Sequence, residues 1–221
     1  MTITIPGKTV VFDYGEVISA IPSGDDRTQL LTLARCDPAD LWNAYWRHRD
    51  ALDRGQVTVK EYWRHIASDL EADWDDATLH QLWLADFRGW LALNVDTLQV
   101  LIDLQQGGTR MALLSNAGRD FASYYRHGMI GDFFDQVFVS CELGVLKPDQ
   151  KAFLAMLDGL GAGPDDVLFI DDRETNVRGA EDLGIRSHLY TSPAQLRSFL
   201  TGFTTSAPPT ADRPTPEPVA L

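Results

Sequence analysis

The feature that most constrains the fold is a set of three short apolar segments, each followed at once by polar side chains. The segments are Thr9–Phe12, Met111–Leu114 and Val167–Ile170. The polar residues after them are Asp13, then Ser115 and Asn116, then Asp171 and Asp172. Apolar runs of this length are typical of buried parallel strands. Because ligands bind at the carboxyl ends of such strands, the pattern predicts an α/β protein with its site at that edge.

From Arg110 onward, strand and helix patterns alternate. Two further strands are predicted at Gln136–Ser140 and Ser187–Tyr190, and helices are predicted at Asp120–His127, Gln150–Gly159, Asn176–Leu183 and Pro193–Leu200. Alternation at this spacing indicates βα units with right-handed crossovers and therefore a parallel sheet.

Between the first strand and this alternating region, the pattern is helical. Helices are predicted at Asp26–Ala34, Pro38–Leu52, Thr58–Leu70, Asp76–Trp90 and Val95–Gln106, the third opening on a Thr58-x-x-Glu61 capping box. All six tryptophans lie between Trp42 and Trp90. We therefore predict an α-helical cap over residues 20–92, inserted into a core made of residues 1–19 and 93–203. The proline-rich residues 204–221 are predicted to be a disordered tail.

Composition excludes several classes of partner. The formal net charge of the 221 residues is −13, which argues against binding to nucleic acid or to an anionic membrane. Cys36 and Cys141 are too few for a disulfide framework and lack zinc-ligand spacing, so we expect reduced thiols. No signal peptide or membrane span is indicated, and we expect a cytoplasmic monomer or homodimer.

Four motifs in this order resemble the signatures of the haloacid dehalogenase-like hydrolases, which are mostly phosphatases. The motifs are Asp13, Ser115, the Lys147-Pro148 pair, and Asp171-Asp172 followed by Asn176. One branch of this family holds sugar-phosphate phosphatases and the phosphatase-like half of epoxide hydrolases. The chain resembles that branch in three features: the position of the cap, the motif Gly-x-x-Lys-Pro and the motif Asp-Asp-x-x-x-Asn. The resemblance implies a Rossmann-like core with an inserted helical cap.

The motif residues fit phosphate-ester hydrolysis. Asp13 is the candidate nucleophile, which would form an aspartyl-phosphate provided that a cation offsets the repulsion between anions. The hydroxyl of Ser115 and the backbone N–H groups at Asn116 could hold a phosphoryl oxygen, and Lys147 could steady both this group and Asp13. By resemblance, Mg²⁺ would be held by Asp13, the Gly15 carbonyl, Asp171 and Asp172. Asn176 matches the family's asparagine, although an asparagine there is also typical of a helix cap.

The sequence departs from the common phosphatase motif beside the nucleophile. Gly15 occupies the position of the second aspartate, which serves as general acid and base in those phosphatases. Glu16 follows, where the family usually has glycine. Three interpretations remain open: Glu16 transfers the proton, a cap residue or the substrate does so, or turnover is slow or absent.

The predicted second cap helix carries a cluster of aromatic and basic residues, Tyr45 to Arg49. Arg47 or Arg49 could contact a sugar hydroxyl or a second anionic group of the substrate. Alternatively, Tyr45 and Trp46 pack inside the cap and both arginines are solvated. The expected function is a Mg²⁺-dependent phosphatase acting on a small phosphorylated metabolite, with a sugar phosphate implied by resemblance. A phospho-ligand-binding protein without turnover is the alternative from another class. A dehalogenase is the rival enzyme, disfavoured because no arginine lies between Asp13 and Arg27.

Overall fold

The computed structural model describes residues 2–204. Five strands are present in this range: β1 (Thr9–Phe12), β2 (Arg110–Ser115), β3 (Gln136–Val139), β4 (Val167–Asp171) and β5 (Arg186–Leu189). The helices after β1 are α1 (Gly24–Ala34), α2 (Pro38–Asp53), α3 (Val59–Asp69), α4 (Asp76–Gly89) and α5 (Val95–Gln106). The later ones are α6 (Arg119–His127), α7 (Ser140–Leu143), α8 (Gln150–Leu160), α9 (Glu174–Glu181) and α10 (Pro193–Thr201). Two 3₁₀ turns are η1 (Met129–Phe133) and η2 (Pro164–Asp166).

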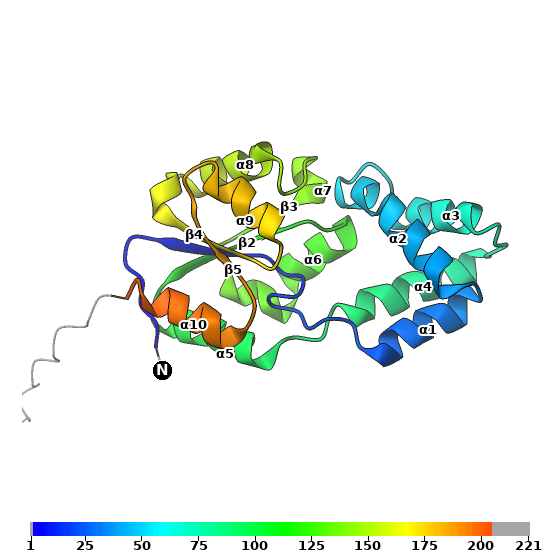
Figure 1. Cartoon of the computed structure of the whole chain (residues 1–221), viewed down its shortest axis with the longest axis horizontal. Coiled ribbons are helices and arrows are strands. Elements are labelled where there is room, and N and C mark those ends of the chain that lie inside the picture. The colour runs from blue at the N-terminus through cyan, green and yellow to red at the C-terminus, as the bar shows by residue number, and fades with distance from the viewer. Residues whose placement is uncertain (1, 205–221) are drawn as a thin grey trace, which may run out of the picture.

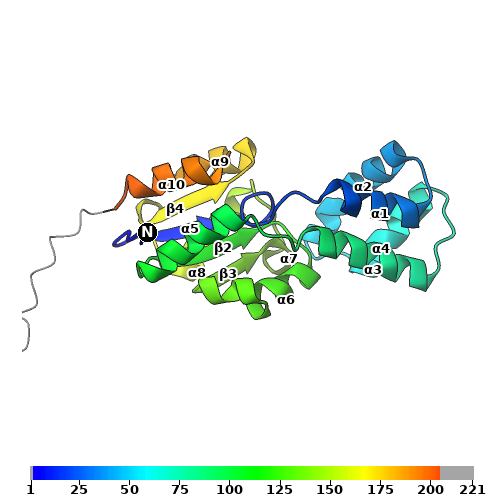
Figure 2. The ribbon, with the colours of Figure 1, turned by 90° about the horizontal axis from the view of Figure 1, so that it is seen from below.

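The strands form one parallel sheet in the order β3-β2-β1-β4-β5. Alternate residues of β1 serve opposite faces: Val10 and Phe12 pack with α5, α6 and α10, whereas Val11 packs with α8 and α9. Figure 1 shows α8 and α9 above the sheet and α5 and α10 below it, and in Figure 2, seen from below, α5 lies in front of the strands. Because both faces are covered, every residue of β1 is buried. The predicted α/β class and Rossmann-like parallel core are confirmed.

The strand order places the motifs side by side. Phe12 pairs with Leu113 of β2 on one side and with Ile170 of β4 on the other. The residues that follow these three positions therefore emerge at one edge of the sheet, with Asp13 in the middle.

Helices α1–α4, here called the cap helices, project from that edge (Figure 1). They enclose a second hydrophobic cluster that includes Tyr62, Trp63 and Leu82. The capping box of Thr58 and Glu61 is confirmed, and a second one, Ser23 with Asp26, starts α1 at Gly24, two residues earlier than predicted. The cap helices lie within residues 20–92, and their assignment to a separate domain stays a prediction.

Two connections join the cap helices to the core. At the first, Ser19 and Leu93 form an antiparallel bridge, so the chain enters and leaves the cap side by side. At the second, the Ser140 hydroxyl donates a hydrogen bond of 2.5 Å to the Asp53 carbonyl at the end of α2. A Cβ atom at Gly55 would collide with the Cys141 carbonyl oxygen, so the backbones approach closely here.

Some predicted bounds were wrong. Strand β3 ends at Val139, and Ser140 instead opens the unpredicted helix α7. Tertiary contacts explain this, because the Ser140 hydroxyl also accepts a hydrogen bond from the Ala117 N–H. Helix α9 begins at Glu174 rather than Asn176, and β5 begins at Arg186 and ends before Tyr190. The predicted tail lies outside the described residues, apart from Thr204. No helix of residues 2–204 is long and apolar enough to cross a membrane.

Candidate active site

Asp13 lies directly after β1 and is buried at the base of a pocket. Its Oδ1 atom accepts a hydrogen bond of 2.7 Å from the Tyr14 N–H and lies 3.0 Å from Lys147 Nζ. Its Oδ2 atom accepts no hydrogen bond from residues 2–204, so one carboxylate oxygen is available to a ligand. Burial raises the pKa of Asp13, partly opposed by Lys147 and reinforced by Asp171.

Lys147 is a buried cation between two carboxylates. Its Nζ atom lies 2.6 Å from Asp171 Oδ2, and it donates a hydrogen bond of 2.8 Å to the Leu114 carbonyl. Burial alone would lower the pKa of Lys147, but Asp13 and Asp171 outweigh it and the pKa is raised. The lysine therefore stays charged and is held in place by three oxygen atoms.

The side chain of Asn116 holds the backbone of Lys147. Its Oδ1 accepts from the Lys147 N–H and its Nδ2 donates to the Lys147 carbonyl, both at 2.9 Å. The amide is thus occupied in positioning the lysine. Only the backbone of Asn116 remains for the predicted contact with phosphate.

The paired aspartates face different surroundings. Asp171 is fully buried, and Asn176 Nδ2 donates to both of its oxygens, at 3.0 and 3.1 Å. The Arg173 N–H donates to Asp171 Oδ1 at 2.8 Å. Asp172 is half-buried and lines the pocket. Asp171 and Asn176 therefore position Lys147, whereas Asp172 presents its carboxylate to a ligand.

Asp13, Asp171 and Asp172 form a cluster that could hold a metal ion. One oxygen from each lies within 4.8 Å of the others. Three carboxylates face one lysine, and burial together with Asp13 and Asp171 raises the pKa of Asp172 to about 7. A set of hard oxygen donors with excess negative charge fits a divalent cation such as Mg²⁺. The Gly15 carbonyl lines the same pocket and accepts no hydrogen bond from the described residues.

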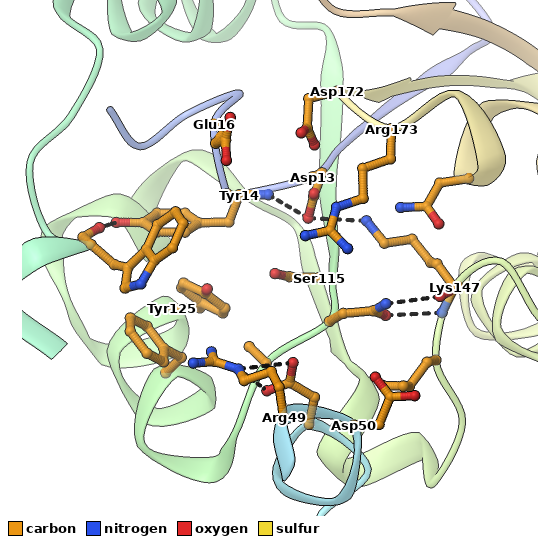
Figure 3. A pocket seen from close by; sticks show the side chains of 18 of the residues that line it. Asp13, Tyr14, Glu16, Arg49, Asp50, Ser115, Tyr125, Lys147, Asp172 and Arg173 are labelled. Atoms are coloured by element: carbon orange, nitrogen blue, oxygen red, sulfur yellow. Dashed lines mark hydrogen bonds and ion pairs between the residues drawn. The ribbon is translucent and has the colours of Figure 1, made fainter. Parts of the chain in front are cut away.

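Ser115 ends β2 and is buried on the floor of the pocket. Figure 3 shows its side chain between Asp13 and Tyr125. Burial raises the pKa of Tyr125, partly offset by a hydrogen bond with Ser115, so the phenol stays protonated. Tyr125, which the sequence analysis missed, adds a hydroxyl next to the predicted one. It lies on α6, ten residues after Ser115 and outside the four motifs.

Glu16 lies at the pocket mouth with an exposed side chain, on the same side as Asp172 in Figure 3. Its φ of 57° is a left-handed conformation that disfavours side chains, which explains why glycine suits this position. At Gly15, by contrast, an added Cβ atom would meet only a Trp90 ring carbon, at 3.9 Å. A Cβ atom would therefore fit at Gly15.

The two arginines of α2 have different positions. Arg49 lines the pocket, but its charge is paired with two aspartates. Its Nε–H donates hydrogen bonds to both carboxylate oxygens of Asp53, at 2.9 and 3.1 Å, and its Nη1 atom lies 3.6 Å from the Asp86 carboxylate. Arg47 is exposed, pairs with Asp69 and lies outside the pocket lining. Of the two predicted alternatives, Arg49 lines this pocket and Arg47 does not, because residues two positions apart on a helix face different directions. Arg49 is a neutralised cation rather than a free one.

Arg173 is the free cation that the sequence analysis overlooked. It lines the pocket and its guanidinium makes no ion pair or side-chain hydrogen bond with residues 2–204. Figure 3 shows its side chain extending over the pocket from beside Asp172. The signal was its position directly after the paired aspartates. Trp46, expected to pack inside the cap, also lines the pocket and is 51% exposed.

The chain belongs to the haloacid dehalogenase-like hydrolase family, whose model matches residues 8–184. A drimenol cyclase of Aspergillus calidoustus is 28% identical over 77% of this chain and 31% of the cyclase. The chain spans a third or less of the length of the first curated relatives that it matches. A D-ribitol-5-phosphate phosphatase of Bacteroides thetaiotaomicron is 23% identical over 88% of this chain and 97% of that enzyme.

Solved structures show the same fold. A family enzyme from Bacteroides thetaiotaomicron in complex with magnesium and inorganic phosphate has a TM-score of 0.68 and 19% identity, covering 83% of this chain and 94% of that one. An L-2-haloacid dehalogenase from Xanthobacter autotrophicus has a TM-score of 0.63 and 21% identity, covering 91% and 84%. Because phosphatase and dehalogenase share the fold, the reaction must be inferred from the site.

Proposed function

We propose that this protein is a Mg²⁺-dependent phosphatase that hydrolyses a small phosphorylated metabolite through an aspartyl-phosphate on Asp13. The observation that carries the proposal is the Asp13 carboxylate, with one free oxygen, beside buried Lys147 and two further aspartates. A carboxylate alone would repel a phosphate dianion. The surrounding cations therefore decide whether attack on phosphorus is possible.

Asp13 and Asp172, together with the carbonyl of Gly15, would hold the ion at the pocket, and Asp171 adds charge from below. Bound Mg²⁺ would neutralise phosphoryl oxygens and keep the Asp13 carboxylate ionised. Lys147 Nζ, 3.0 Å from Asp13 Oδ1, would orient the Asp13 carboxylate for attack on the phosphorus atom. Ser115, the backbone at Asn116 and the Arg173 guanidinium are placed to donate hydrogen bonds to the phosphoryl oxygens.

Glu16 is the proposed general acid and base. As an acid, it would protonate the departing alkoxide; as a base, it would then remove a proton from the water that hydrolyses the aspartyl-phosphate. The support is its place in the pocket lining beside Asp13, in a left-handed conformation that glycine would adopt at less cost. Gly15 has no side chain to perform this step.

A sugar or polyol phosphate is the substrate class that the family resemblance implies, and one similar protein is named as a D-ribitol-5-phosphate phosphatase. The cap helices contribute Trp46, Arg49 and Asp50 to the pocket, so they would contact the alcohol part of such a substrate. No nucleic acid or membrane partner is proposed, in keeping with the net charge of −13.

Phosphate release from a panel of phosphorylated metabolites tests the proposal. We expect release that requires Mg²⁺, stops with EDTA and is lost in Asp13→Asn. Halide release from a 2-haloacid that is insensitive to EDTA would instead support a dehalogenase. Saturable binding of phosphorylated ligands without any phosphate release would support a binding protein and overturn the enzyme assignment.

A further inference from the structure

A second cavity lies among the cap helices and adjoins the reaction pocket. Eight of its lining residues are apolar or aromatic: Ile21, Pro22, Leu30, Trp42, Tyr45, Trp46, Ala85 and Trp90. Glu16, Trp46 and Trp90 line both this cavity and the pocket of Asp13. A molecule whose phosphate contacts Lys147 could therefore continue past Glu16 into the cavity.

Two exposed apolar side chains lie where the cavity opens. Trp46 is 51% exposed and Ile21 is 54% exposed, although both come from a region with a well-buried core of its own. The Trp46 indole faces both the pocket and the cavity, so the protein does not gain the free energy that burying this ring would supply. This surface is available to a ligand, because Trp46 contacts its neighbour Tyr45 only edge-on, with ring centroids 4.9 Å apart.

The polar groups divide the path into two parts. Asp50, Arg49 and Asp53 line the reaction pocket, where they suit the hydroxyl groups of a sugar or polyol. In the cavity beyond, Arg27 is exposed and makes no ion pair with the described residues. Indole rings with one free guanidinium suit a flat ring that carries heteroatoms at its edge.

We propose that the substrate is a sugar or polyol phosphate that bears a flat aromatic ring, which the cap cavity binds against Trp46 and Trp90. This inference rests on the proposed phosphatase function and names its substrate class. A phosphorylated sugar without the ring would reach the polar pocket and leave the aromatic cavity to solvent. The ring-bearing compound gains the stacking and apolar contacts in addition.

Two matched pairs of substrates test the inference. Ribose 5-phosphate and adenosine 5′-monophosphate share the phosphorylated ribose, and ribitol 5-phosphate and flavin mononucleotide share the ribityl phosphate. Only the second member of each pair has a ring. We expect kcat/KM to be about tenfold or more higher for the ring-bearing member of at least one pair, as stacking on an aromatic side chain predicts.

The variant Trp46→Ala should remove most of this preference, because kcat/KM should fall further for the ring-bearing compound than for its ring-free partner. Leu84→Ala is the matched control, since Leu84 is an exposed apolar residue of α4 outside both cavities. A preference that survives Trp46→Ala, or that Leu84→Ala removes equally, overturns the assignment of the cavity.

The failure of this inference can be told apart from that of the proposed function. If the ring-free compounds were hydrolysed as well as or better than their partners in both pairs, the aromatic ring would be excluded from the substrate class. The proposed phosphatase function would stand. The same holds if none of the four is hydrolysed but other phosphate esters are, with dependence on Asp13. No phosphate release from any ester would overturn both.

Discussion

Asp13 and Asp171 share one lysine but have different remaining contacts. Asp171 accepts hydrogen bonds on both oxygens, whereas Asp13 keeps Oδ2 free of the described residues. A nucleophilic carboxylate needs one free oxygen and a fixed orientation. A carboxylate that only positions its neighbours can have hydrogen bonds on both oxygens. The contacts of each carboxylate therefore indicate nucleophilic attack for Asp13 and positioning for Asp171. The sequence motif alone does not distinguish these two roles.

Glu16→Gln tests the proposed proton transfer. The amide keeps the size and the left-handed backbone but cannot exchange a proton, so we expect kcat to fall about 100-fold for alkyl phosphates. Because Gly15 has space for a side chain, Gly15→Asp in the Glu16→Gln background should recover part of the rate. Unchanged turnover in Glu16→Gln would show that another group transfers the proton.

Arg173→Ala tests the free guanidinium. Removing a charged donor to phosphate should raise KM about tenfold or more, with the fold unchanged because the side chain is exposed. Arg178→Ala is the control, since Arg178 is an exposed arginine of α9, the helix that begins directly after Arg173, and it pairs with Glu174. Equal kinetics for both variants would exclude Arg173 from substrate binding.

At the scale of elements, the sequence predicted the three central strands well. Apolar runs before Asp13, Ser115 and Asp171 identified β1, β2 and β4 because burial on both faces leaves a continuous apolar signal. Helix α7 was missed because Ser140 begins it through contacts with Asp53 and Ala117, which are remote in sequence. The pairing of Arg49 with Asp86 could not be predicted either, since it depends on how α2 packs on α4.

Gly55→Ala tests the contact between α2 and α7. Gly55 has a φ of 69°, and a Cβ atom there would meet the Cys141 carbonyl. Gly144 has a φ of 71° with nothing near its Cβ position, so Gly144→Ala reports the cost of the left-handed backbone alone. We expect Gly144→Ala to lower the free energy of unfolding by about 1 kcal/mol and Gly55→Ala by about 3 kcal/mol. Equal losses by chemical denaturation would mean that the two backbones separate freely.

At the scale of the whole molecule, stability should depend on pH and metal together. The pKa of Asp172 is raised to about 7 and that of Asp53 to about 6, so the folded state binds protons that the unfolded state releases. Their contribution to stability is present below about pH 4 and is lost as pH rises through about 6 to 7. Without metal, the free energy of unfolding should therefore fall over this range.

Mg²⁺ should reverse this loss, because it replaces the protons that the aspartate cluster has released. We expect Mg²⁺ to raise Tm more at about pH 8 than at about pH 5. Asp172→Asn should abolish most of the Mg²⁺-induced shift in Tm. An equal Mg²⁺-induced shift in Tm at both pH values would contradict the assignment of the ion to this cluster. So would an equal shift in the unmodified protein and in Asp172→Asn.

The central claim is that Asp13 carries the phosphoryl group. We would mix the Glu16→Gln variant with p-nitrophenyl phosphate and Mg²⁺, quench with acid and measure the mass of the intact protein. This leaving group needs no acid, so phosphorylation should proceed while hydrolysis is slow, adding about 80 Da to the protein. The adduct should be absent from the Asp13→Asn, Glu16→Gln double variant. Release of p-nitrophenol without any such adduct, or an adduct that persists without Asp13, would contradict the account.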